Sequence, residues 1–256
     1  MLLLFIMAPI LMVVALSFTS GSTLQFPPPG WSLRWYESAW GLLSTSDVTT
    51  ERLRESLGMS FVIGATTAVV AVIVGLPAAY TLARLRFRGK LFVEQMITLP
   101  LAFPLVVLGV ALLVMISQLR IEVGFWRLVV AHVVITIPFV VRNCAASLVG
   151  LNASLEEAAV CLGANRLRTF CEIILPLMRP GVLAGALLAF IISFNEFTVA
   201  YFLYTVEVFP FPIWLFTKSN TSLDPTIFAL SALIVLFDAF LIWILDRAVG
   251  KQGVSL

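Results

Sequence analysis

Residues 156–180 read EEAAVCLGANRLRTFCEIILPLMRP and form a polar segment in a strongly hydrophobic chain. Its charged side chains would each cost several kcal/mol in the hydrocarbon core of a membrane, so the segment is predicted to lie outside that core. Its Ala, Leu and Glu residues favour a helix, and Gly163 interrupts that helix because glycine readily adopts a positive φ. We therefore predict two short helices that meet at a bend between two membrane spans.

The rest of the chain has the composition of a polytopic membrane protein. Of its 256 residues, 61% are hydrophobic and only 12% are charged, whereas soluble domains are usually about a quarter charged. This length accommodates six spans of about 20 residues with their loops and leaves no room for a separate soluble domain. We predict an all-α fold with six transmembrane helices in contact with membrane lipid. A net charge of +2 gives no indication of nucleic-acid binding.

The apolar runs predict where the six spans lie, at about 1–17, 56–83, 91–118, 126–147, 178–203 and 224–245. No basic residue precedes the first run and no small-residue cleavage site follows it, so it is interpreted as a span rather than a signal peptide. Pro100 and Pro104 are expected to bend the third span. In the fifth span, Gly181 and Gly185 are spaced to let another helix approach closely.

The segments between the runs predict the domain organisation. Residues 18–55 are polar and rich in Pro and Gly, and the aromatic residues of WSLRWYESAW at 31–40 predict a short helix along the outer membrane surface. Residues 204–223 are predicted to be an outer loop. We divide the chain into 1–55 (first span and periplasmic segment), 56–248 (a five-helix core containing the loop at 150–177) and 249–256 (a polar tail).

The basic residues predict the orientation. Four of them fall within RLRFRGK at 84–90, and positive charge favours the cytoplasmic side of a membrane. On the path above, ten of the sixteen Lys and Arg residues lie on that side and six on the other. Both termini and the 156–180 segment are therefore expected in the cytoplasm.

The sequence contains no recognisable catalytic or metal-binding motif. It lacks a G-x-x-x-x-G-K-[ST] nucleotide-binding loop, a paired-histidine metal motif and a nucleophile–base pair. His132 lies in an apolar run, where a packing hydrogen bond is the expected role, and the three cysteines have no metal-like spacing. We therefore expect neither an enzyme nor a cofactor-binding chain, and any ATP-driven work has to be supplied by a partner.

The 156–180 segment resembles the signature loop of ABC importer permeases. The pattern EAA-x3-G-x9-I-x-LP falls on seven residues of this sequence: Glu157, Ala158, Ala159, Gly163, Ile173, Leu175 and Pro176. This resemblance implies the type I (MetI-like) permease fold and a docking role for these residues on a cytoplasmic ATPase subunit. It also implies a bacterial inner membrane as the location. The partners that it implies are a second, related permease subunit, two ATPase subunits that bind ATP and Mg, and a periplasmic substrate-binding protein.

Local sequence is similar to the spermidine/putrescine importers, particularly to the second of their two permeases. The similarity lies in FRGK at 87–90, GFW at 124–126, IPFVVR at 137–142, SFNEF at 193–197 and LDPTIFALSALIVL at 223–236. It extends over the chain from about residue 30 and implies a polyamine cargo.

Asn195 and Glu196 are the candidate substrate-pathway residues, because an ionisable group inside an apolar span favours a functional role. The polyamine permeases carry two acidic residues here, so Asn195 leaves one charge fewer. Phe194, Tyr201, Tyr204 and Trp214 are candidates for an aromatic wall around an ammonium group. The alternatives are that Glu196 pairs with a neighbouring helix or faces water, and that the aromatic residues only pack.

Other cargoes and other classes of protein remain open at this point. A substrate with fewer charges, such as a mono-amine, betaine, opine or amino-acid-like compound, fits one missing carboxylate. Importers of the same type carry thiamine, phosphonate or ferric iron. A secondary transporter would need no ATPase and would leave the signature loop unexplained, and a membrane-embedded enzyme would need catalytic groups that the sequence lacks.

Overall fold

The computed structural model describes residues 2–23, 25–44, 48–120, 124–152, 154–222 and 224–250. These residues are mainly helical, and their only β-type pairing is an isolated bridge between Thr19 and Trp31. They form two compact units. Unit 1 comprises Met1–Ser60 with Thr205–Ile242, and unit 2 comprises Phe61–Tyr204 with Trp243–Leu256. The predicted all-α class is confirmed.

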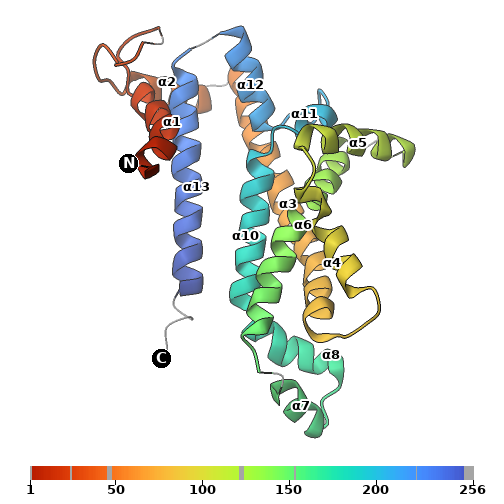
Figure 1. Cartoon of the computed structure of the whole chain (residues 1–256). Coiled ribbons are helices and arrows are strands. Elements are labelled where there is room, and N and C mark those ends of the chain that lie inside the picture. The colour runs from red at the N-terminus through yellow and green to blue at the C-terminus, as the bar shows by residue number, and fades with distance from the viewer. Residues whose placement is uncertain are drawn as a thin grey trace. The chain divides into compact units, whose positions relative to one another are not determined.

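Unit 1 contains α1 (Leu2–Ser17), α2 (Arg34–Ser44), α12 (Phe211–Thr221), the first turns of α3 (Val48–Arg84) and most of α13 (Thr226–Gly250) (Figure 1). Its core combines residues from four of these helices, namely Ala39, Leu53, Phe211, Ala229 and Leu230. The hydroxyl groups of Ser17 and Tyr36 lie 2.7 Å apart and connect the end of α1 to α2. The interfacial helix predicted at 31–40 therefore corresponds to α2, which packs on the rest of unit 1 through Ala39.

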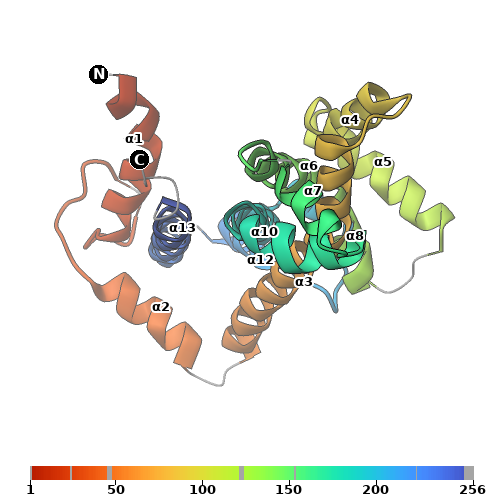
Figure 2. The ribbon, with the colours of Figure 1, turned by 90° about the horizontal axis from the view of Figure 1, so that it is seen from below.

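Unit 2 is built around α6 (Gly124–Val149) and α10 (Arg179–Asn195), which lie side by side (Figures 1 and 2). A Cβ atom added to Gly181 would lie 2.6 Å from the Asn143 carbonyl oxygen, and one added to Gly185 would lie 3.0 Å from the Val140 Cα. Both distances are shorter than van der Waals contact, so only glycine permits this approach. The close helix packing predicted from Gly181 and Gly185 is confirmed.

The third predicted span is broken. It consists of α4 (Lys90–Thr98), the 3-10 turn η1 (Leu99–Leu101) and α5 (Leu105–Gln118), with an angle of 107° between Lys90–Leu101 and Leu105–Gln118. Pro104 lies directly before α5, with a ψ of 130° that a continuing helix does not allow. The bend predicted from Pro100 and Pro104 is confirmed.

Within the described ranges, three helical segments are long and apolar enough to cross a membrane, namely Glu51–Arg84, Gly124–Val149 and Thr226–Arg247. Two bent pairs of helices raise the number to five when each pair is taken as one span, and Phe5–Ser17 is a shorter apolar helix. The total of six spans stays a prediction.

Two boundaries differ from those predicted. The fifth span was expected to continue to residue 203, but α10 ends at Asn195 and a separate turn, α11 (Ala200–Leu203), follows. The backbone of Glu196 is not helical, because its ψ is 113°. Its carboxylate accepts a hydrogen bond from the Val199 amide in the turn that follows. The outer loop expected at 204–223 contains α12, which begins after Pro210 and has a second proline in its first turn, where the missing N–H is tolerated.

Candidate functional site

The signature segment folds at one end of the α6–α10 pair, where it forms α7 (Ser154–Cys161), α8 (Arg166–Thr169), the π-helical turn η2 (Phe170–Ile174) and α9 (Leu175–Leu177) (Figure 1). Gly163 ends the first helix with a φ of 89°. The Gly163 amide donates to the Val160 carbonyl at 2.9 Å, and the Ala164 amide donates to the Ala159 carbonyl at 3.0 Å. This is the Schellman pattern, which requires a left-handed residue where Gly163 stands.

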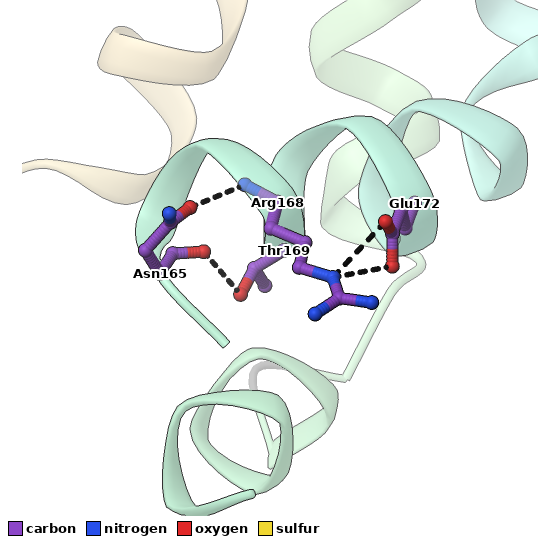
Figure 3. A network of polar contacts seen from close by, with 4 residues as sticks. All are labelled: Asn165, Arg168, Thr169 and Glu172. Carbon is purple, nitrogen blue, oxygen red and sulfur yellow. Dashed lines mark hydrogen bonds and ion pairs between the residues drawn. The ribbon is translucent and has the colours of Figure 1, made fainter. Parts of the chain in front are cut away.

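Asn165 starts the second helix (Figure 3). Its side-chain oxygen accepts a hydrogen bond from the Arg168 amide at 2.8 Å, and its carbonyl oxygen accepts one from the Thr169 hydroxyl at 3.1 Å. One turn on, the Arg168 Nε lies 3.0 Å from both carboxylate oxygens of Glu172. The two side chains of this pair are 66% and 60% exposed, so it contributes at most about 0.5 kcal/mol. The bend is therefore set mainly by Gly163 and the Asn165 cap.

The seven signature residues divide into two groups. Glu157, Ala158 and Gly163 are exposed. Ala159 is buried, Ile173 packs against the core of unit 2, and Leu175 and Pro176 are half-buried. Beside the exposed group, the side chain of Leu162 is 89% exposed, which leaves an apolar group on the outward face of the bend. One group thus anchors the segment to the helices, and the other faces outward.

A polar cluster that the sequence did not predict connects the segment to α3. The Arg84 Nε lies 2.8 Å from the Glu156 Oε1, as an ion pair without a well-aligned hydrogen bond, and the two side chains are only 18% and 20% exposed. The Tyr80 hydroxyl donates to the Glu156 Oε2, and an Arg84 guanidinium N–H donates to the Leu151 carbonyl, both at 2.9 Å. In the sequence, the only feature that indicates this cluster is that Tyr80 and Arg84 lie one helical turn apart at the end of a span. This Tyr80–Arg84–Glu156 cluster fixes the position of α7.

The candidate pathway residues lie at and just after the end of α10. Phe194 is buried and stacks on Phe190, with ring centroids 5.7 Å apart. Asn195 is exposed, and its amide group donates to the Ile191 carbonyl at 2.9 Å. Glu196 is 9% exposed, and its Oε1 accepts the Val199 N–H at 2.9 Å. The Glu196 carboxylate therefore stabilises the turn that follows α10.

The aromatic candidates are divided between the two units. The Tyr201 ring lies 5.6 Å from that of Phe197 and 6.1 Å from that of Tyr204, and both tyrosines are partly exposed. Trp214 belongs to unit 1, where it stacks on Phe211. The structure therefore brings Tyr201 and Tyr204 together near the end of α10.

The remaining polar candidates have local partners. The His132 Nδ1 lies 2.7 Å from the Ser193 hydroxyl, and this buried contact joins α6 to α10, as expected for a packing hydrogen bond. Asp224 accepts hydrogen bonds from the amide and the hydroxyl of Thr226 and so caps α13. In the described part of the chain, no group of His, Cys, Asp and Glu is arranged to hold a metal ion.

The comparisons with known proteins agree with this arrangement. Residues 71–251 match the model of the family described as "Binding-protein-dependent transport system inner membrane component". The chain belongs to this family. As a family member it is an ABC importer permease and a multi-pass membrane protein, and the predicted resemblance of the chain to this family is confirmed.

Two relatives and one solved structure cover nearly the whole chain. The putrescine transport system permease protein PotI of Escherichia coli (strain K12) is 35% identical over a gapped alignment of 260 positions, which covers 98% of this permease and 89% of PotI. The spermidine/putrescine transport system permease protein PotC of the same strain is 32% identical over 236 residues, 91% of this permease and 85% of PotC. A chain of a bacterial ABC transporter involved in alginate import aligns with a TM-score of 0.67 at 20% identity, covering 99% of this permease and 92% of that chain. The expected permease fold is confirmed.

Proposed function

We propose that this permease carries a polyamine, or a related small organic amine, across the inner membrane as one subunit of an ATP-driven importer. The observation that carries the proposal is the 35% identity to a putrescine permease over 98% of the chain. A spermidine/putrescine permease with similar coverage supports the same cargo class.

The proposed coupling element is the exposed side of the bend between α7 and α8. Glu157 offers a carboxylate to basic groups of an ATPase subunit, Ala158 permits close approach, and the exposed Leu162 offers an apolar contact. The buried Ala159 and the half-buried Ile173, Leu175 and Pro176 connect this face to the helices. A displacement of these exposed residues by a partner would therefore be transmitted to the membrane-spanning helices.

The proposed assembly follows from this role. A second, related permease completes the pathway, and two cytoplasmic ATPase subunits bind ATP and Mg and close on the α7–α8 bends. A periplasmic substrate-binding protein delivers the cargo. A cytoplasmic position for this end of the molecule is supported by its four basic residues, because positive charge is retained on that side of a membrane. These residues are Arg84, Arg86, Arg88 and Lys90.

The proposed substrate contacts lie at the end of α10. Asn195 is exposed there, and the partly exposed Tyr201 and Tyr204 offer aromatic faces to an ammonium group. Phe194 supports the end of the helix from the buried side. Glu196 supplies negative charge in an apolar setting while its Oε1 stabilises the turn.

Uptake by cells that carry the complete transporter tests the cargo. Labelled putrescine and spermidine are supplied with unlabelled betaine, amino acids or opines as competitors. Saturable uptake of a polyamine that the other compounds do not inhibit is the expected result. If cells take up neither polyamine but accumulate one of the competitors, the proposal of an importer would stand and the proposal of a polyamine cargo would be wrong.

A further inference from the structure

Unit 1 contains an acidic cavity that the transport function described above does not use. It has a volume of about 250 Å³ and lies between the first turns of α3 and the segment that precedes α12. Glu51 and Glu55 line it from α3, and because they are four residues apart they share one face of the helix. Glu207 lines it from the facing segment. Among the described residues, none of these three carboxylates forms an ion pair.

Ser56 gives independent evidence that the cavity is built for a ligand. Its side chain is 1% exposed and lines the same cavity, and its hydroxyl oxygen has no hydrogen-bond partner among the residues described. Ser60, one turn further along α3, differs: its hydroxyl oxygen accepts the Phe211 N–H at 2.8 Å. A buried hydroxyl without a partner is unfavourable, so the Ser56 hydroxyl is available to a polar group that enters the cavity.

The charges in the cavity suit a dication. The Arg52 guanidinium lies 4.9 Å from the centre of the Phe209 ring, so its charge is directed at an aromatic face. Three carboxylates against this one guanidinium leave two negative charges. Hydrogen bonds from its own amide and from the Thr205 hydroxyl lower the pKa of Glu207, so this carboxylate is ionised at neutral pH.

The arrangement of the carboxylates does not favour a single metal ion as the ligand. No three acidic side chains of the described residues come close enough together to coordinate one ion. The carboxylates are instead distributed over two segments of the chain, and the apolar side chains of Met59 and Phe209 line the same cavity. Carboxylates on two segments, together with an apolar lining, match a flexible aliphatic chain that carries an ammonium group at each end.

We propose that this cavity binds a short aliphatic diamine, with Glu51, Glu55 and Glu207 holding its ammonium groups and Ser56 accepting one of their hydrogen bonds. The inference rests on the proposed amine cargo and adds a second site to the one at Asn195 and Glu196. A negatively charged cavity raises the local concentration of a cation, so the site would hold cargo at the permease before it enters the pathway.

Equilibrium binding of labelled putrescine to the assembled transporter in lipid nanodiscs, without ATP or binding protein, tests the site. The variants are the double substitution Glu51→Gln/Glu55→Gln, the single substitutions Glu207→Gln and Ser56→Ala, and Glu37→Gln as the matched control. Glu37 is an exposed carboxylate of α2 that does not line the cavity. Glu207 is fully exposed, so its substitution does not endanger folding.

We expect salt-sensitive putrescine binding that survives Glu196→Gln and weakens about fivefold or more in the double variant and in Glu207→Gln. Ser56→Ala should weaken it by a smaller factor, Glu37→Gln should not change it, and butylamine, with one charge, should compete poorly. Equal binding by the double variant and the wild type, or an equal loss in Glu37→Gln, would overturn the site.

The same variants distinguish a diamine site from a surface that docks the binding protein. Together with the uptake experiment, they also test the diamine site independently of the proposed polyamine cargo. Variants that bind putrescine normally but lose stimulation of ATP hydrolysis by the binding protein would assign the cavity to protein docking and overturn the diamine site. If cells import putrescine but the purified complex shows no salt-sensitive binding, the polyamine cargo would be supported and the diamine site would be refuted. If salt-sensitive binding occurs without any uptake, the diamine site would be supported and the polyamine cargo would be refuted.

Discussion

The Arg84 guanidinium at the end of α3 lies 2.8 Å from the Glu156 carboxylate at the start of α7, and both side chains are about four-fifths buried. Glu157, the next residue, is exposed. Two adjacent glutamates of the same helix therefore have different surroundings. Glu156 is held by Arg84 and Tyr80 within the permease, and Glu157 is presented outward.

Glu156→Gln is expected to weaken the coupling between ATP hydrolysis and import. Loss of one partner of this largely buried pair should cost about 1–3 kcal/mol and leave α7 less firmly positioned. The measurement is the number of ATP molecules hydrolysed per substrate imported, which should rise. Exchanging the charges, Arg84→Glu with Glu156→Arg, should recover part of the coupling. Arg168→Gln is the control, since that exposed pair is worth at most about 0.5 kcal/mol; an equal effect there would refute a special role for Glu156.

Gly163→Ala is expected to impair transport by straining the bend. Its φ of 89° costs a residue with a Cβ atom about 1–2 kcal/mol, although in the described structure no atom lies within 4 Å of that Cβ position. Gly89 is a matched control, with a φ of 88° and equally open surroundings. Co-purification of the ATPase subunits should decrease for Gly163→Ala and not for Gly89→Ala, and Gly163→Asp should uncouple or disassemble the complex. Normal assembly and transport by Gly163→Asp would count against a docking role for the bend.

Gly181→Ala is expected to destabilise the α6–α10 pair. The added methyl group would meet the Asn143 carbonyl oxygen at 2.6 Å, and relieving that overlap should cost about 1–3 kcal/mol. Gly58→Ala is the control, because a Cβ at that helical position meets no described atom within 4 Å. Thermal unfolding in detergent should therefore occur at a lower temperature for Gly181→Ala only. A comparable decrease for both variants would indicate that the close packing is not the cause.

Glu196→Gln is expected to separate the two roles of this residue. The Gln side chain keeps an oxygen that can accept the Val199 N–H, so the turn and the yield of protein should be retained, while the negative charge is lost. We expect the KM for putrescine to rise about tenfold, which corresponds to about 1.4 kcal/mol. Glu196→Ala removes both roles and should also lower the yield. An unchanged KM in Glu196→Gln would assign Glu196 to the turn alone.

The features that the sequence predicted correctly depend on local chemistry. Apolar runs identify α3, α6 and α13 as candidate spans, Pro104 marks the break before α5, and Gly163 marks the bend after α7. In each case the residue itself limits the backbone, so no knowledge of distant contacts is needed.

The features that the sequence did not predict depend on distant contacts or on mixed composition. Residues 210–221 combine two prolines with Lys, Ser, Asn and Thr, all of which are frequent in loops. Residues 211–221 nevertheless form α12, and Phe211 at its start is buried in the core of unit 1. Arg84 is one of four basic residues in a short run, and only the fold identifies it as the partner of Glu156. The end of α10 depends on the hydrogen bond that the Glu196 carboxylate accepts from the Val199 amide, and helix propensity alone does not predict this bond.

The tight contact between α6 and α10 at Gly181 and Gly185 restricts how the permease can move. Because both glycines lie where a Cβ atom would overlap α6, these two helices are expected to move together as one rigid body. Any hinge is then expected where the helices already break, at Pro104 and at the turn after Asn195. A small molecule that binds at either break is therefore expected to stop transport without binding to the ATPase subunits proposed above.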